Sequence, residues 1–145
     1  MLPTKIVIIG AGSAIFGLNS LAAMMNSQRL RGSHVALVDQ NATALGWVAR
    51  RAERLNREWD ARISLSNHTH HADALDGAAF VVSAIEVPPR EQLWQSDYEI
   101  PLTYGVRQPY AENGGPGGFA HAARNIGPVM RIIRDMEQTC PEAWF

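Results

Sequence analysis

Ile6-Val-Ile-Ile9-Gly10-Ala-Gly12-Ser-Ala-Ile15-Phe16-Gly17 is the segment that points most clearly to a fold. Its first four residues are all β-branched or aliphatic, which is typical of a parallel strand buried on both faces. Two glycines follow at once, where an ordinary strand would continue. Apolar residues then recur near helical spacing over residues 16–29. The segment therefore predicts a strand, a tight turn and a helix.

The two glycines suit a turn that holds a pyrophosphate. Gly10 would permit the tight turn, and Gly12 would let the backbone approach the phosphates. The amides at the start of the helix would then hold the anion. The third glycine of the usual Gly-x-Gly-x-x-Gly pattern is absent, because Ile15 stands there. A bare Gly-x-Gly is a weak signal, but its position after the first strand strengthens it.

Asp39 ends a second predicted strand, Val35–Val38. An acid at this position accepts hydrogen bonds from both hydroxyls of the adenosine ribose, which favours NAD over a cofactor with a 2′-phosphate. The alternative is that the glycines merely make a turn and that Asp39 caps the next helix. The cofactor interpretation is favoured because two independent features fall at matching strand ends.

The remaining pattern alternates strands and helices, which predicts a Rossmann-like α/β fold with a doubly wound parallel sheet in three α/β/α layers. Residues 1–145 are expected to form one NAD-binding domain, cut off before the substrate domain of a larger enzyme. Trp47 and Trp59 are expected to pack in the core. The other predicted elements are helices at 42–59, 91–98 and 118–139, strands at 63–66 and 80–85, a helical turn at 73–77, a loop at 104–118, and a tail at 140–145 that begins a further strand.

Composition excludes several classes of function. The net charge is -1, Lys5 is the only lysine, and no basic run stands out, so binding to nucleic acid is not expected. Cys140 is the only cysteine, which excludes an internal disulfide and a zinc cluster built from cysteines. The apolar run near the N-terminus is too short for a signal peptide or a membrane span. A cytoplasmic protein without a membrane partner is therefore expected.

Two further segments have both a functional and a structural explanation. His68-Thr-His-His71 resembles a metal site, but adjacent histidines point in different directions, so a solvated loop is favoured. Cys140, before Pro141, is interpreted as structural. In Glu112-Asn-Gly-Gly-Pro-Gly-Gly118 the glycines can form a simple loop before a helix, or their amides can face a ligand with Glu112 at the entrance. These two alternatives are equally weighted.

Several stretches together resemble glycoside hydrolase family 4, the NAD- and manganese-dependent glycosidases, over essentially the whole chain. They are Gly10-Ala-Gly-Ser13 with Phe16, Phe80–Ile85, Glu99–Gln108, Gly115-Pro-Gly-Gly118 with Ala123–Ile126, and Asp135–Trp144. The resemblance implies hydrolysis of O-glycosyl bonds by a redox-elimination route: NAD takes hydride from C3 of the sugar, manganese assists removal of the C2 proton by a tyrosine, and the hydride later returns.

The resemblance also implies roles for individual residues. The cofactor-binding residues would be Gly10, Gly12, Ser13, Ala14, Phe16, Asp39 and Ile85. Glu112 would raise the basicity of the catalytic tyrosine, and Asn113 would reach the sugar. Arg90 lies in the segment where phosphoglycosidases of the family carry a phosphate-reading arginine, but the spacing differs, so a glycoside without a 6-phosphate is predicted. The tyrosine and the Mn²⁺ ligands would lie beyond residue 145.

Other functions stay open from the residues alone. One alternative is the NAD-binding domain of a 2-hydroxyacid-type dehydrogenase, which would consume NAD during net turnover, unlike the glycosidase. Another is a stand-alone nucleotide-binding module. The full-length protein is expected to be a homo-oligomer.

Overall fold

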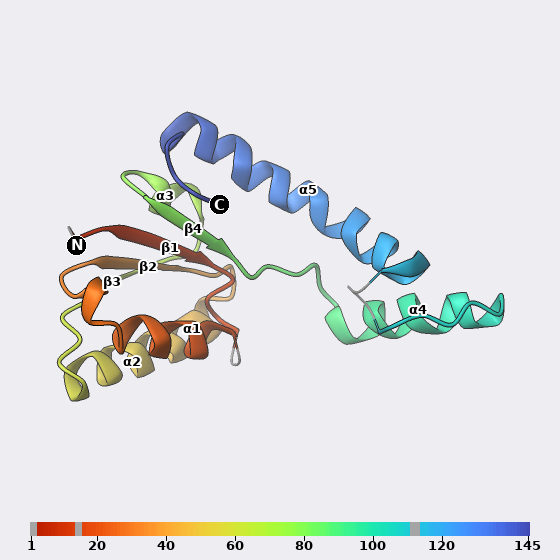
Figure 1. Cartoon of the computed structure of the whole chain (residues 1–145), viewed down its shortest axis with the longest axis horizontal. Helices are drawn as coiled ribbons and strands as arrows, with labels where there is room; N and C mark the ends of the chain where they lie inside the picture. The colour runs from red at the N-terminus through yellow and green to blue at the C-terminus, as the bar shows by residue number, and fades with distance from the viewer. Residues whose placement is uncertain (1–2, 14–15, 111–113) are drawn as a thin grey trace. The chain divides into compact units, whose positions relative to one another are not determined.

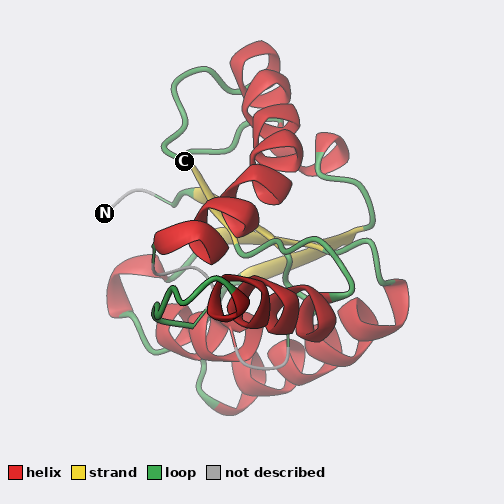
Figure 2. Cartoon of the chain, turned by 90° about the vertical axis from the view of Figure 1, so that its right-hand side faces the viewer, coloured by secondary structure: helices red, strands yellow, loops and turns green. Residues whose placement is uncertain are grey.

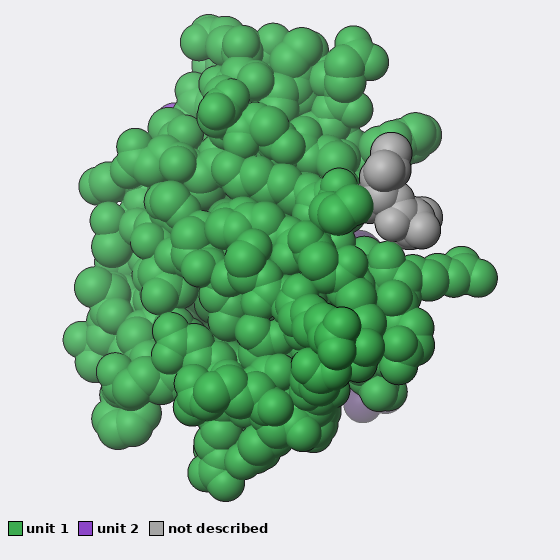
Figure 3. Space-filling model, turned by 90° about the vertical axis from the view of Figure 1, so that its left-hand side faces the viewer, with its two compact units in different colours: residues 1–84, 132–145 green, residues 85–131 purple. Residues whose placement is uncertain are grey.

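The computed structural model describes residues 3–13, 16–110 and 114–145. Three predicted site residues, Ala14, Glu112 and Asn113, therefore lie outside the described residues. The chain forms two compact units, coloured separately in Figure 3. Unit 1 comprises residues 1–84 and 132–145, and unit 2 comprises residues 85–131.

Unit 1 is built around a parallel sheet of four strands in the order β3-β2-β1-β4 (Figure 1). The strands are β1 (Lys5–Ile9), β2 (His34–Val38), β3 (Ser64–His68) and β4 (Phe80–Ser83). β1 lies in the middle, where its apolar residues are covered on both faces, as their β-branched character favours. This is the doubly wound parallel sheet that the alternating pattern predicts, and its order is that of one half of a Rossmann fold.

Helices cover both faces of this sheet, which confirms the three layers within unit 1. α1 (Phe16–Met25) and α2 (Ala42–Glu58) pack on one face, and α3 (Ala72–Leu75) lies on the other (Figures 1 and 2). Ile6 and Ile8 point into the core shared with α1 and α2. Val7 lies between them on the strand and is fully buried on the opposite face, as the two-residue period of a strand requires.

The C-terminal tail adds to the sheet. Trp144 forms an isolated parallel bridge with Phe80, and its carbonyl accepts a hydrogen bond of 2.8 Å from the amide of Val81. The Trp144 amide in turn donates to the carbonyl of Ala79 at 3.0 Å. The prediction that the tail begins another strand is confirmed, because Trp144 pairs with Phe80 at the edge of the sheet, where a fifth strand would lie beside β4.

Some predicted boundaries are wrong. α1 ends at Met25 rather than near Arg29, and a short 3₁₀ helix, η1 (Gln28–Leu30), follows it. In unit 2, α4 (Arg90–Thr103) extends beyond the predicted helix at 91–98, and α5 (Gly115–Thr139) begins three residues earlier than predicted. The last residues of α5 belong to unit 1.

α4 continues through Pro101 because another side chain replaces the hydrogen bond that the proline removes. A proline has no amide hydrogen, so the carbonyl of Asp97, four residues earlier, loses its helical donor. The side-chain amide of Gln108 donates to this carbonyl at 2.7 Å instead. A local pattern therefore suggests a helix end before the proline, whereas a residue from the following loop permits the helix to continue.

Trp47 in α2 and Trp59, the residue just after it, correct a second prediction. Trp47 is 67% exposed and Trp59 is 46% exposed, so neither packs in the core. The buried side of the helix is formed instead by Leu45, Val48, Ala49 and Ala52. Trp47 lies off that side because each residue turns the helix by about 100°. Its ring lies under the guanidinium of Arg50, whose Cζ atom is 4.5 Å from the ring centroid.

Candidate cofactor site

The turn after β1 follows the predicted conformation. Gly10 has a φ of 89°, a left-handed backbone that glycine adopts without steric cost. The amides of Gly10 and Ala11 both donate to the carbonyl of Val38, at 2.9 and 3.0 Å. These two bonds tie the loop to the end of β2. The carboxyl ends of β1 and β2, where a doubly wound sheet binds its ligand, are thereby held together.

Gly12 and Asp39 contact each other directly. The Gly12 amide donates to Asp39 Oδ2 at 2.8 Å. A Cβ at position 12 would lie 2.7 Å from the same oxygen and 3.1 Å from the Cβ of Ala44. Glycine is therefore required here by the protein's own packing, whether or not a pyrophosphate also approaches. The contact also brings together the two features on which the cofactor prediction depends.

The alternative role for Asp39 as the cap of α2 is filled by Asn41. The Asn41 side chain accepts a hydrogen bond of 3.0 Å from the amide of Ala44, which is the usual bond of a helix cap. Asp39 Oδ1 instead accepts from the amide of Asn41 at 2.8 Å. Asp39 thus joins the glycine loop to the start of α2. Each carboxylate oxygen keeps a lone pair for a further donor.

Gly17 allows the close helix packing that the third glycine of a dinucleotide loop usually allows. The sequence pattern did not identify Gly17 in this role. A Cβ on Gly17 would lie 2.2 Å from the carbonyl oxygen of Ala11. Helix α1 therefore approaches the loop more closely than any other residue type would permit. The glycine falls two positions later than in Gly-x-Gly-x-x-Gly. The spacing Gly10, Gly12, Gly17 was visible in the sequence, but only the contact identifies its purpose.

Ser13 and Phe16 lie at the start of α1. The Ser13 hydroxyl accepts a hydrogen bond of 3.2 Å from the amide of Phe16, and the Ser13 carbonyl accepts one of 3.1 Å from Gly17. The Phe16 side chain is 42% exposed. An exposed aromatic ring beside a glycine loop leaves apolar surface that a bound nucleotide could cover.

Unit 2 places Arg90 in a close polar cluster. Its Nε atom lies 2.7 Å from Glu86 Oε2, and its Cζ atom lies 4.4 Å from the centroid of the Trp94 ring. The indole N–H of Trp94 donates to Glu86 Oε1. Ile85, a further predicted cofactor residue, is half-buried at the start of this unit. Arg90 is thus held by its own neighbours.

The Gly115-Pro-Gly-Gly118 segment has a structural explanation. The Gly117 amide donates to Gln108 Oε1 at 3.0 Å, and a Cβ at position 117 would lie 2.3 Å from the carbonyl oxygen of Asp97. Gly115 has a φ of 67°. Both glycines are needed for α5 to begin against α4. Packing therefore accounts for Gly115 and Gly117, while the alternative that amides of this segment face a ligand beside Glu112 stays a prediction.

Asp97 and Arg124 form a buried ion pair across α4 and α5. Asp97 is 6% exposed, and Arg124 Nη1 donates to its Oδ1 at 2.9 Å while Nη2 donates to Oδ2. The hydrogen bonds to Asp97 raise the pKa of Arg124. This pair gives a structural explanation for the arginine in the motif Ala123–Ile126.

The prediction that His68–His71 form a solvated loop is only partly right, because two of these histidines have partners in unit 1. His68 is the last residue of β3, and His71 Nε2 lies 2.7 Å from Asp135 Oδ2. His68 belongs to a chain of hydrogen bonds along the sheet. Ser66 Oγ lies 2.8 Å from His68 Nε2 and 2.9 Å from His34 Nε2. Strand alternation brings these side chains to one face of the sheet, which the sequence spacing alone did not reveal.

The donor and the acceptor of each hydrogen bond in this series can be assigned from the hydroxyl of Ser64. The Ser64 hydroxyl donates to the Ser33 carbonyl, at 3.4 Å, so its oxygen accepts from His34 Nδ1, which lies 2.9 Å away. His34 Nε2 is then free of a proton and accepts from the hydroxyl of Ser66. A neutral His34 completes every bond. Burial, then Lys5 and His68, lower the pKa of His34 below 6.5.

We expect the free energy of unfolding to fall as the pH drops below about 6.5, because unfolded His34 then takes up a proton that the folded protein resists. Above this pH both states are neutral at His34 and its contribution is complete. Urea unfolding at a series of pH values measures the effect. The His34→Gln variant should lose part of this slope, whereas the variant of the exposed His70, His70→Gln, should keep it. Equal slopes in all three proteins would contradict the prediction.

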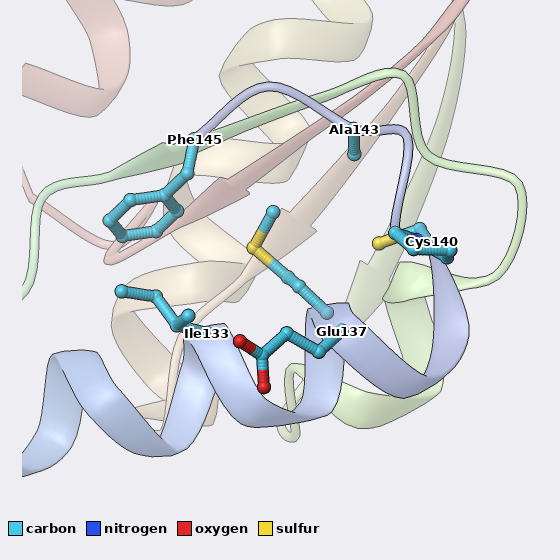
Figure 4. Close-up of a pocket in the computed structure, with 7 residues that line it drawn as sticks. Ile133, Glu137, Cys140, Ala143 and Phe145 are labelled. Atoms are coloured by element: carbon cyan, nitrogen blue, oxygen red, sulfur yellow. The ribbon is translucent and has the colours of Figure 1, made fainter.

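A small apolar pocket of about 250 Å³ lies at the end of α5 in unit 1 (Figure 4). Ile133, Met136, Cys140 and Phe145 contribute to its wall. Cys140 is buried, and burial raises the pKa of its thiol, which agrees with a structural role. Within residues 3–13, 16–110 and 114–145, no three His, Cys, Asp or Glu side chains are grouped to hold a metal ion. In the same residues no helix is long and apolar enough to cross a membrane.

Comparison with known proteins identifies the family. The model of the family 4 glycosyl hydrolases matches residues 5–145. The chain belongs to glycosyl hydrolase family 4. It is 43% identical over 142 residues to an alpha-glucosidase of Erwinia rhapontici, covering 98% of this chain and 31% of that protein. It is 35% identical to an alpha-galactosidase of Bacillus subtilis, covering 97% of this chain and 33% of that protein.

A solved family structure shares the fold. The 6-phospho-alpha-glucosidase from gut microorganisms, in complex with NAD and Mn²⁺, superposes with a TM-score of 0.79 at 22% identity. The match covers 99% of this chain and 32% of that one. The chain thus spans about one third of the length of its relatives. Family membership favours the glycosidase prediction over the dehydrogenase alternative.

Proposed function

We propose that this family 4 chain is the NAD-binding part of a glycosidase that cleaves O-glycosyl bonds by a redox-elimination route. The observation that carries the proposal is the contact between Gly12 and Asp39 at the carboxyl ends of β1 and β2. It places an acid and a close-packed glycine turn together, as recognition of an adenosine diphosphate requires. NAD bound there would supply a hydride acceptor for the sugar.

Individual residues have distinct parts in this proposal. Gly10 and Gly12 shape the turn, and Asp39 accepts hydrogen bonds from the ribose hydroxyls. Ser13 and Phe16 flank the phosphates at the start of α1, and Ile85 follows β4. Ala14, Glu112 and Asn113 keep their predicted roles as proposals, since they lie outside the described residues. A cytoplasmic location and a homo-oligomeric state also remain proposals.

The substrate is proposed to be a glycoside without a 6-phosphate group. The two relatives reported above are an alpha-glucosidase and an alpha-galactosidase, at 43% and 35% identity. A maltose-6'-phosphate glucosidase of Fusobacterium mortiferum is less similar, at 31% identity. Manganese dependence is proposed from family membership, and no ligand for the metal is assigned among the described residues of this chain.

Changing Asp39 to Asn should lower the preference of the chain for NAD over NADP. An asparagine carries no charge to repel a 2′-phosphate, and it can accept only on one side, so one of the bonds to Gly12 and Asn41 is also lost. The ratio of the two dissociation constants, measured by calorimetry, should change by about tenfold or more, the effect of 1.4 kcal/mol.

Asn41→Ala is the matched control for this experiment. It removes the cap of α2 two residues from Asp39, at a cost of about 1 kcal/mol in stability, but it leaves the carboxylate in place. Its ratio of NAD to NADP affinity should equal that of the unchanged chain. An Asp39→Asn variant with an unaltered ratio would show that the acid does not bind the ribose.

A further inference from the structure

Arg90 is neutralised by the carboxylate of Glu86, four residues earlier in the chain and before the start of α4. The guanidinium Nε atom lies 2.7 Å from Glu86 Oε2, and the face of the guanidinium lies over Trp94 at 4.4 Å. Arg90 is 52% exposed in its side chain, whereas Glu86 is 23% exposed. A ligand that approaches Arg90 therefore meets the nearly neutral Arg90–Glu86 ion pair, in which the carboxylate is the less exposed partner.

Several contacts hold Glu86 in this position. The Trp94 indole N–H donates to its Oε1 atom, and His121 Nδ1 lies 3.7 Å from the same oxygen. Trp94 and His121 meet edge to face, with ring centroids 6.0 Å apart. Both carboxylate oxygens thus have partners in unit 2. Glu86 cannot turn away from Arg90 without leaving the indole N–H without its acceptor.

This arrangement opposes anions and tolerates neutral ligands. A phosphate that approached Arg90 would also approach the Glu86 carboxylate, and two like charges a few ångströms apart repel each other strongly near a protein surface. A sugar hydroxyl meets no such repulsion, and it can both donate to a carboxylate and accept from a guanidinium. In the sequence, Glu86 follows the last residue of β4 by three positions.

We infer that Glu86 is a specificity-determining residue that keeps Arg90 from binding anionic groups of a substrate. This inference rests on the proposed glycosidase function and names the substrates it admits: sugars with neutral hydroxyl groups rather than phosphorylated sugars. Glu86 acts through Arg90 and is a positioning residue. Removing its charge should therefore create an anion site that the unchanged chain lacks.

The test is a titration of this chain with glucose 6-phosphate, and separately with glucose, followed by the NMR signals of the Trp94 indole N–H and Arg90 Nε–H. In the unchanged chain glucose 6-phosphate should not move these signals in a saturable way. In Glu86→Gln, whose amide oxygen still accepts from Trp94, glucose 6-phosphate should shift both signals in a saturable way, with a dissociation constant at least about tenfold below the weakest binding that the titration could detect in the unchanged chain. Glu86→Met tests whether charge alone is responsible and should give the same gain.

Two controls separate this gain from general effects. Glu58→Gln removes the acid of the exposed pair with Arg54, which has the same four-residue separation and the same 2.7 Å distance, and it should create no site. The double variant Glu86→Gln with Arg90→Gln should lose the binding that the single variant gains. A change confined to stability would not produce new anion binding.

Either of two results would overturn the inference: saturable binding of glucose 6-phosphate at Arg90 in the unchanged chain, or its absence in both neutral variants when their spectra show a folded unit 2. NAD affinity is measured on the same samples. If the neutral variants gain anion binding but the chain does not bind NAD, only the proposed function is contradicted. If the chain binds NAD but the neutral variants do not gain anion binding, only the role of Glu86 is contradicted.

Discussion

Replacing Gly17 with alanine is expected to destabilise unit 1 by about 3 kcal/mol, at the upper end of the usual cost of overpacking. The new Cβ would lie 2.2 Å from the Ala11 carbonyl oxygen, which is backbone and cannot rotate away. Either α1 or the glycine loop must move, and the Gly12–Asp39 contact moves with the loop. Urea unfolding followed by circular dichroism measures the change. NAD affinity should fall in the same variant if the loop binds the cofactor.

Gly46→Ala is the matched control, because Gly46 is also a helical glycine. A Cβ there would meet only the flexible end of Arg50, at 3.5 Å. Alanine has the higher helix propensity, so this variant should be more stable, by up to about 1 kcal/mol. Opposite signs for the two substitutions would establish that the space around Gly17, rather than helix propensity, decides the result. A stabilised Gly17→Ala chain would contradict the close contact.

Replacing Arg124 with methionine should cost about 1–3 kcal/mol in the stability of unit 2, because it leaves the buried carboxylate of Asp97 without its donor, although Arg124 itself is only partly buried. Asp97, at 6% exposure, would keep a carboxylate with no cation beside it. Thermal unfolding at neutral pH measures the effect.

Two comparisons make this prediction specific. Arg54→Met breaks an ion pair in which both side chains are exposed, and it should leave unfolding almost unchanged. The double variant Arg124→Met with Asp97→Asn should recover part of the loss, because no uncompensated charge is left buried. Equal effects of Arg124→Met and Arg54→Met would contradict the importance of burial at Asp97.

Local patterns were sufficient to predict the sheet and the glycine turn at its edge. The apolar runs at residues 6–9 and 35–38 and the glycine at 10 each act on neighbouring backbone, where burial and φ depend on few residues. The order of strands and helices then limits the possible topologies to a parallel, doubly wound sheet. The match of ordered motifs indicated the family, which the family model over residues 5–145 confirms.

Helix boundaries and exposure were harder to predict, because distant residues alter both. α4 passes through Pro101 only because Gln108 donates to the carbonyl that the proline leaves unpaired. Trp47 is apolar and was expected in the core, yet its angular position on α2 places it outside, over Arg50. The apolar character of Trp47 did not distinguish it from the apolar residues that form the buried side of the helix.

The sequence alone established a strand, a glycine turn and an acid at the end of the next strand, since these are properties of short segments. Tertiary structure alone revealed the close contacts of Gly12, Gly17 and Gly117, each with atoms outside its own turn or helix. It also joined Glu86 to Arg90 and Trp94, and Asp97 to Arg124. The physical reason is that steric exclusion and ion pairing depend on distances in space, which residue order does not contain.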